Sequence, residues 1–158
     1  MVDQPEADQD QALVVGIGTG FNVSPVLRDG GRIACLSVEA GHASLYASLG
    51  NALDQLKPGL SRAFPTVEAL FSGKGRRRFL SLVTGEPVER ATPYIGKFGE
   101  AGNEVFDAAL DHYAALIGYL LKELQLDYMP TSGIFLAGGV ARSSLIGSRA
   151  ALCSAVSV

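Results

Sequence analysis

Three glycines and a threonine lie close together near the start of the chain, where their spacing could hold a phosphate. They are Gly16, Gly18, Thr19 and Gly20, and they end an apolar run that begins at residue 12. Because glycine lacks a Cβ atom, backbone N–H groups of such a turn can converge on an anion, and the threonine hydroxyl can donate one further hydrogen bond. The turn therefore indicates nucleotide or phosphoryl chemistry. The alternative is an ordinary glycine-rich hairpin that binds nothing.

The segment after this turn excludes the two commonest phosphate loops. A dinucleotide-binding fingerprint and a Walker loop both lead from a strand directly into a helix, and the Walker loop also carries a lysine. Here the next segment, residues 22–27, has the pattern of a second strand, and the lysine is missing. We therefore expect a strand-to-strand hairpin.

Two acids and a histidine further along could bind a polyhydroxylated molecule. Glu39 and His42 follow the third predicted strand, and Glu68 lies near the start of a short predicted helix. A carboxylate accepts hydrogen bonds from hydroxyl groups, and an imidazole can donate or accept them. Each also has a plainer interpretation, because Glu39 and His42 could be ordinary surface residues and Glu68 could simply favour the N-terminus of its helix.

A second glycine pair, Gly138 and Gly139, follows the apolar run of residues 133–137. Without side chains, the backbone there can closely approach a flat ligand or a phosphate. A tight turn from a strand into a helix would explain the same pair without a ligand.

The elements that must position these residues form a simple order. Apolar runs at 12–17, 22–27 and 32–37 are separated by short glycine turns, and Asp29-Gly30-Gly31 is a strong hairpin signal, so we expect an antiparallel meander. A buried strand is expected over 133–137. Helical patterns cover residues 45–56, 67–71 (after an N-cap at Thr66 and before a stop at Ser72-Gly73), 76–83, 103–124 and 143–155. This order predicts one α/β lobe with a mixed sheet.

Composition limits the class of protein. The 158 residues are 47% hydrophobic with a formal net charge of -3, which is typical of one globular domain, expected over 12–158 after a polar lead at 1–11. The only run of basic residues, Arg76 to Arg78, is explained more economically by a solvated helix end than by a nucleic-acid site. No nucleic-acid partner is therefore expected.

Cysteines and apolar runs point to the cytoplasm. Cys35 and Cys153 lie far apart and form no CxxC pair, so we expect neither a disulfide framework nor a protein metal site. No apolar run reaches membrane-spanning length, and the first dozen residues are acidic and polar, unlike a signal peptide. We expect a cytoplasmic protein without a membrane partner.

Taken in order, these segments resemble bacterial ATP-dependent glucokinase, within the hexokinase and actin-like sugar kinase superfamily. The first glycine turn resembles the family's second phosphate loop, and Ala137-Gly138-Gly139-Val140 its adenosine-side turn. Glu39-Ala40-Gly41-His42 resembles its Glu-Gly-Gly-His sugar segment, and Glu68 with Ser72-Gly73-Lys74-Gly75 its Glu plus Ser-Gly-Pro-Gly segment. Ala40 and Lys74 depart from the family pattern, which affects loop geometry there but leaves the polar ligands in place.

The resemblance implies an actin-like, ribonuclease-H-like ATPase lobe, namely the C-terminal one. It implies that ATP and Mg²⁺ are used to phosphorylate glucose or a related hexose at its 6-hydroxyl. In this comparison Glu39, His42 and Glu68 hydrogen-bond the sugar. The nucleotide side comprises Gly16, Gly18, Thr19 and Gly20 at the phosphates and Gly138 and Gly139 at the adenosine.

Two expected parts of such a kinase are not found in the sequence. These are an N-terminal phosphate loop of the Asp-Gly-Gly-Thr type and the aspartate that acts as base. Asp29-Gly30-Gly31-Arg32 lacks the strand and threonine context. We therefore expect no catalytic residue here, a lobe truncated at both ends, and little activity from this chain alone. Two alternatives remain open: a non-catalytic binding or assembly module, which could form a homodimer, and the lobe of a kinase for another sugar.

Overall fold

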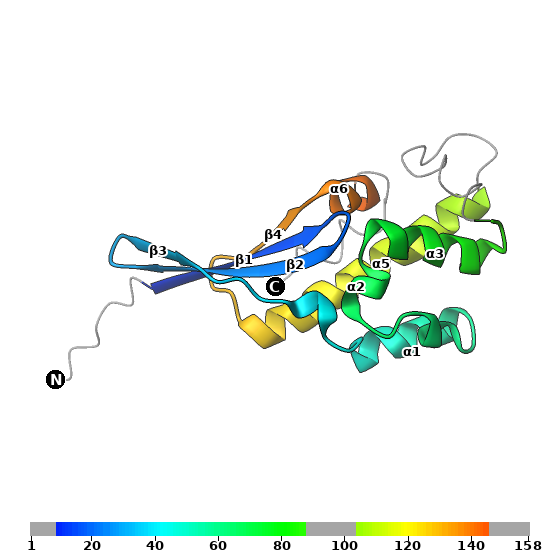
Figure 1. Cartoon of the computed structure of the whole chain (residues 1–158), viewed down its shortest axis with the longest axis horizontal. Helices are drawn as coiled ribbons and strands as arrows, with labels where there is room; N and C mark the ends of the chain where they lie inside the picture. The colour runs from blue at the N-terminus through cyan, green and yellow to red at the C-terminus, as the bar shows by residue number, and fades with distance from the viewer. Residues whose placement is uncertain (1–8, 88–103, 146–158) are drawn as a thin grey trace.

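The computed structural model describes residues 9–87 and 104–145, which form a four-stranded mixed sheet with helices packed against it (Figure 1). The sheet has the order β3-β2-β1-β4, and its strands are β1 (Gln9–Ile17), β2 (Phe21–Asp29), β3 (Arg32–Cys35) and β4 (Ile134–Ala137). Strands β1, β2 and β3 pair antiparallel in succession, whereas β4 pairs parallel to β1. The predicted meander, the later strand and the mixed sheet are all confirmed.

Strand β1 begins earlier than its apolar pattern indicates. Gln9 pairs with Asp29 of β2. Gln11 forms two further hydrogen bonds: its backbone N–H donates to Thr131 Oγ1 at 2.9 Å, and its side-chain Nε2 donates to the Tyr128 carbonyl at 2.7 Å. The predicted start of this strand at residue 12 is therefore three residues too late, because backbone pairing extends a hairpin strand beyond its buried part. Residues 1–8 lie outside the described part of the chain.

Five helices lie in the described residues, and each overlaps a helix that the sequence predicts. They are α1 (Ala47–Leu56), α2 (Val67–Leu70), α3 (Gly73–Thr84), α5 (Glu104–Tyr128) and α6 (Gly139–Leu145). Short 3-10 turns span Ala40–His42 and Leu60–Ala63. The Thr66 side chain caps α2 as predicted, accepting a hydrogen bond from the Ala69 N–H at 3.1 Å.

Two helices begin before their predicted starts. Helix α3 starts at Gly73 because the Ser72 hydroxyl accepts from the Gly75 N–H at 3.0 Å, so Ser72 separates α2 from α3 and also caps the second. Helix α6 starts at Gly139, not at Ser143, directly after the glycine turn. The remainder of that predicted helix, residues 146–155, and residue 103 lie outside the described residues.

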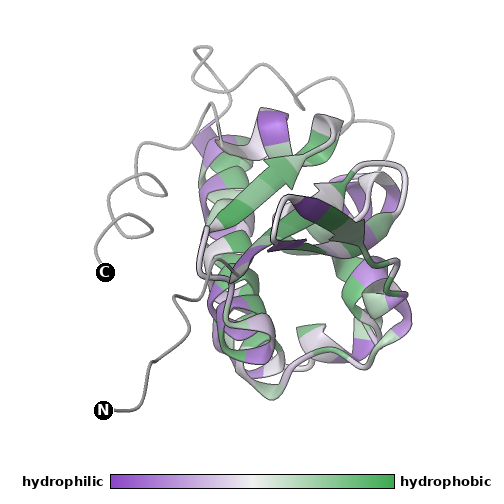
Figure 2. Cartoon of the chain, turned by 90° about the vertical axis from the view of Figure 1, so that its left-hand side faces the viewer, coloured by the Kyte–Doolittle hydropathy of each residue, from purple (hydrophilic) through white to green (hydrophobic). Residues whose placement is uncertain are grey.

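The core fills the space between one face of the sheet and the helices. Leu13, Val15 and Ile17 on β1 are fully buried, while the alternate residues Val14 and Gly16 are only half-buried. The helices alternate hydrophobic and hydrophilic residues along their length, as expected for helices that bury one side (Figure 2). None of the described helices is long and apolar enough to cross a membrane.

An aromatic cluster joins the helices in this core. The rings of Phe79 and Tyr113 lie 5.4 Å apart between centroids, and Phe71 lies 6.0 Å from Tyr113. The buried Tyr113 hydroxyl donates to the Leu70 carbonyl at 3.0 Å. Helix α5 thereby fixes the end of α2, the helix that carries Glu68.

Candidate functional site

The first glycine turn is a hairpin connection that is tied both to itself and to a helix. The Gly18 N–H donates to the Gly20 carbonyl at 2.9 Å, and the Gly18 carbonyl accepts from the Gly73 N–H at 2.7 Å. The start of α3 therefore holds this turn in place. Thr19, at its tip, is exposed and accessible to a ligand.

Gly16 lies outside the turn itself. It sits inside β1, opposite Asn22 of β2 and Ala137 of β4, so the sheet pairs it on both sides. A Cβ atom there would meet only the Asn22 carbonyl at 3.8 Å, an ordinary contact. Of the four predicted residues of this segment, Gly18, Thr19 and Gly20 form the tip, and Gly16 supports them.

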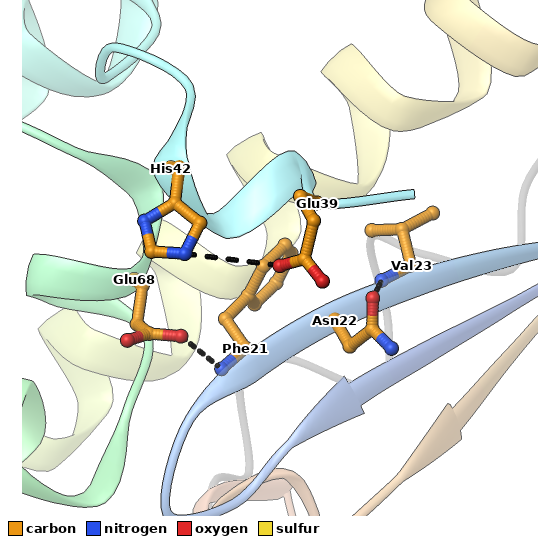
Figure 3. A network of polar contacts seen from close by, with 6 residues as sticks. All are labelled: Phe21, Asn22, Val23, Glu39, His42 and Glu68. Carbon is orange, nitrogen blue, oxygen red and sulfur yellow. Dashed lines mark hydrogen bonds and ion pairs between the residues drawn. The ribbon is translucent and has the colours of Figure 1, made fainter. Parts of the chain in front are cut away.

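Glu68 on α2 contacts the residue at which the chain leaves the turn. Its Oε2 atom accepts a hydrogen bond from the Phe21 backbone N–H at 3.0 Å (Figure 3). The same oxygen lies 3.0 Å from the position that a Cβ atom of Gly20 would occupy. Glu68 therefore lies directly against the glycine turn, and its contact goes beyond favouring the N-terminus of its own helix.

The segment with Glu39 and His42 reaches the same place through Gly41. A Cβ atom on Gly41 would lie 2.9 Å from the Phe21 carbonyl and 3.2 Å from the Glu68 Cβ, so only glycine permits this approach. Glu39 precedes the short 3-10 turn, and His42 ends it. Gly41 thus brings the segment against both β2 and α2.

Glu39 and His42 extend into solvent side by side. His42 Nε2 lies 3.7 Å from Glu39 Oε2, and the side chains are 75% and 79% exposed (Figure 3). With Glu68 close by, the structure brings together all three predicted sugar-binding residues. Carboxylate and imidazole groups that stay accessible in one place can pair with several hydroxyl groups of one small molecule.

The second glycine pair packs against the end of β1. Gly138 has a φ of +97°, and a Cβ atom there would lie 2.4 Å from the Ile17 carbonyl, so both backbone conformation and space require glycine. Gly139 begins α6 and has open space around it. Together with Leu136, Ala141 and Arg142, the two glycines line a solvent-open cavity of about 400 Å³.

The two glycine turns and the start of α3 converge. A Cβ atom on Gly73 would lie 3.4 Å from the Gly18 carbonyl and 3.9 Å from Val140 Cγ2. The structure therefore brings the predicted phosphate turn and the predicted adenosine-side turn together at the carboxyl ends of the parallel strands β1 and β4.

The predicted solvated helix end at Arg76–Arg78 is wrong for Arg76. This side chain is only 6% exposed, and its Nη1 donates to Ser143 Oγ at 2.7 Å and to Ser144 Oγ at 3.0 Å. Burial lowers the pKa of its guanidinium. The signal was its helical spacing, because position 76 lies on the same face of α3 as the buried Phe79 and Leu80.

No cluster of three or more His, Cys, Asp and Glu side chains that could hold a metal ion occurs within residues 9–87 and 104–145.

Asp29-Gly30-Gly31 forms the β2–β3 hairpin turn, with positive φ at both glycines. Because Asp29 pairs with Gln9 and Phe21 pairs with Ile17, this turn lies at the opposite end of the β1–β2 hairpin from the Gly18 turn.

Comparison with known proteins gives a consistent result. The family model described as Glucokinase matches residues 1–147. Glucokinase from Caulobacter sp. (strain K31) is 27% identical over 144 residues, and glucokinase from Paramagnetospirillum magneticum is 30% identical over 145. These matches cover 87% and 86% of this chain but only 43% and 44% of those proteins.

Solved structures agree at the level of the fold. The crystal structure of a glucokinase from an Antarctic psychrotroph superposes with a TM-score of 0.61 at 28% identity, covering 94% of this chain and 48% of the other. A glucokinase from Balamuthia mandrillaris superposes with a TM-score of 0.59 at 17% identity, covering 91% and 42%. The chain thus spans less than half the length of each of these four relatives.

Proposed function

This chain belongs to the glucokinase family of sugar kinases, and we propose that it supplies the sugar-binding wall and part of the nucleotide-binding wall of an ATP-dependent hexose kinase. The reaction that we propose for the whole protein is transfer of the γ-phosphoryl group of ATP to the 6-hydroxyl of glucose. Glucose phosphorylated in this way is a substrate for glycolysis.

The observation that carries this proposal is the contact between Glu68 and the glycine turn. One carboxylate oxygen accepts from the Phe21 N–H at 3.0 Å, at the point where the chain leaves the proposed phosphate turn. A kinase must hold its acceptor hydroxyl and the transferred phosphoryl group next to each other, because correct placement supplies much of the rate. Glu68 lies between the proposed phosphate turn, at Gly20, and the proposed sugar segment, at Gly41.

On the sugar side, we propose that Glu39, His42 and Glu68 hydrogen-bond the hexose hydroxyls. Glu39 and His42 are mostly exposed and 3.7 Å apart, so both can turn toward one ligand. A site built from such groups discriminates against analogues that leave them unpaired.

On the nucleotide side, we propose that Gly18, Thr19 and Gly20 meet the phosphates, supported by Gly16, and that Gly138 and Gly139 border the adenosine. Gly138, where glycine alone fits, and Gly139 are both exposed, so their backbone is accessible to a ligand, which fits a nucleotide. Mg²⁺ would be held through the phosphate oxygens, since the described residues offer no metal-binding cluster. When bound, it neutralises developing charge on the phosphoryl group.

The base that accepts the proton of the 6-hydroxyl is not proposed from the described residues. Asp29, next to two glycines, is excluded because its turn lies at the far end of the β1–β2 hairpin. We propose that the base and an opposing phosphate loop come from a second lobe. Without them, this lobe binds ligands but transfers phosphoryl groups poorly.

Calorimetric titration with glucose tests the sugar site. Glu39→Ala and His42→Ala should each weaken glucose binding about tenfold, the equivalent of one charge-assisted hydrogen bond. Asp29→Ala, which removes an exposed acid at the far end of the hairpin, is the control and should bind like the unaltered chain. Unchanged affinity in both site variants would refute the assignment, and parallel titrations with mannose and galactose identify the preferred hexose.

The exposed side of α5 favours an additional role in assembly. Val105, Tyr119, Leu126 and Met129 on and just after this helix are between 48% and 74% exposed. We propose that the protein forms a homodimer in the cytoplasm, and the same feature would serve a non-catalytic assembly module. Sedimentation measures the oligomer, and glucose titration separates the two roles because a pure assembly module binds no sugar.

A further inference from the structure

The three consecutive arginines of α3 point to three different places. Arg76 is buried against Ser143 and Ser144 of α6. The guanidinium of Arg78 lies over the Phe64 ring, 5.8 Å from its centroid. Arg77 does neither: its Nη1 atom lies 3.7 Å from the position that a Cβ atom of Gly73 would take.

That position at Gly73 lies where the Gly18 turn and the segment after Gly138 come close to each other. The same Cβ atom would be 3.4 Å from the Gly18 carbonyl and 3.9 Å from Val140 Cγ2. The Arg77 guanidinium therefore lies back along α3 beside Gly73, whose own N–H donates to the Gly18 carbonyl at 2.7 Å. It is half-buried there, so it remains accessible to a ligand.

Nothing in the described part of the chain neutralises Arg77 at this place. No carboxylate of residues 9–87 and 104–145 forms an ion pair with it. Helix α3 also carries Lys74 near its start and has no acidic residue in its first turn. The start of a helix is the positive end of its dipole, so cations placed there are destabilising. A bound anion would offset this repulsion.

We propose that Arg77 binds the phosphates of the nucleotide, between the Gly18–Gly20 turn and the Gly138–Gly139 turn. The inference rests on the proposed function, because it assigns a further ligand to the same nucleotide site. A guanidinium can form two parallel hydrogen bonds to one phosphate, a geometry that a lysine cannot reproduce. Arg77 thus supplies a positive side chain next to the first turn, in addition to Arg142 in the cavity at the second turn.

The test compares three ligands by calorimetry on the full chain: Mg-ATP, inorganic tripolyphosphate and adenosine. Arg77→Ala should weaken Mg-ATP and tripolyphosphate about tenfold or more, as expected for loss of a charge-assisted contact. Adenosine affinity should stay unchanged. Arg77→Lys should recover part of the loss, because it keeps the charge but not the two-pronged geometry. Arg78→Ala removes the same charge one residue away and should bind all three ligands normally.

Each contrary result identifies which assignment fails. If Arg77→Ala binds Mg-ATP and tripolyphosphate normally, the inference is wrong while the nucleotide site stands. An equal loss of adenosine binding, or an equal effect of Arg78→Ala, would also overturn it, because the effect would then come from folding or overall charge. If the unaltered chain binds glucose but neither phosphate ligand, the nucleotide site and the role of Arg77 are both refuted and the sugar site is retained.

Discussion

The Glu68 carboxylate and the Phe21 backbone N–H form a 3.0 Å hydrogen bond that joins helix α2 to the first residue of β2. Gly41 packs against both residues, so the sugar segment, α2 and the glycine turn meet around this bond. One oxygen of this acid therefore fixes the backbone, and we propose that the acid also binds the sugar. The two tasks can be separated by mutation.

Glu68→Gln should separate ligand binding from folding. The amide oxygen still accepts from the Phe21 N–H, so we expect the free energy of unfolding to fall by less than about 1 kcal/mol. Glucose affinity should fall about tenfold, since the charged acceptor is lost. Urea unfolding and calorimetric titration measure the two effects. Equal affinity of the variant and the unaltered chain would exclude Glu68 from the sugar site.

Gly41→Ala should disrupt the approach of the sugar segment. Its new methyl group would lie 2.9 Å from the Phe21 carbonyl, which is backbone and cannot rotate away. We expect a destabilisation of about 1–3 kcal/mol and weakened glucose binding.

The matched control is Gly118→Ala on α5, where a Cβ atom would meet nothing within 4 Å. This change should stabilise the chain by up to about 1 kcal/mol, because alanine favours a helix. If both variants unfold at the same urea concentration, close packing at Gly41 does not matter for stability.

Arg76→Ala should destabilise the chain far more than Arg78→Ala. The first removes three hydrogen bonds that a buried guanidinium donates to α6, and leaves the Val140 carbonyl and two serine hydroxyls without that partner. We expect a cost of about 3 kcal/mol for Arg76→Ala, as for other charged hydrogen bonds in the interior, and about 1 kcal/mol or less for Arg78→Ala. Similar urea midpoints for the two variants would show that Arg76 does not anchor α6.

Alkaline pH should destabilise the fold through its tyrosines. Burial raises the pKa of Tyr113. The pKa of Tyr46 is also raised, mainly by burial and secondly by its 2.6 Å hydrogen bond to Asp127. Because the unfolded side chains lose their protons near the ordinary pKa of 10.0 and the folded ones only at higher pH, the free energy of unfolding should fall as pH rises above that value. Tyr113→Phe should reduce this slope in urea titrations. Parallel pH profiles for the two proteins would contradict the role of Tyr113.

The sequence predicts the framework well, because the framework follows local rules. Turn glycines and alternating apolar residues locate β1 and β2, and the Thr66 cap locates α2. The starts of α3 and α6 are missed, because Ser72 can both end one helix and cap the next, and because Gly139 is a weak helix former that tertiary packing overrides.

The sequence selects candidate residues for the site but not their geometry. Glu39, His42 and Glu68 could be selected by type and order, yet the contact of Glu68 with Phe21 spans 47 residues and follows from no local pattern. The partners of Arg76 lie 67 and 68 residues away, so its helical spacing indicates a buried position but not the residues that it contacts. Such long-range contacts depend on how the helices pack.

The parallel pairing of β1 with β4 has a consequence for the order of folding. β1, β2 and β3 can pair through tight turns, whereas β4 joins β1 only after a loop closure that sets Gln11 against Thr131, 120 residues apart. Contacts of high sequence separation form late, because the entropy of closing the chain must be met first. We therefore expect the Gly18 turn to form early in a hairpin, and the Gly138 turn to form in the slower step that docks β4.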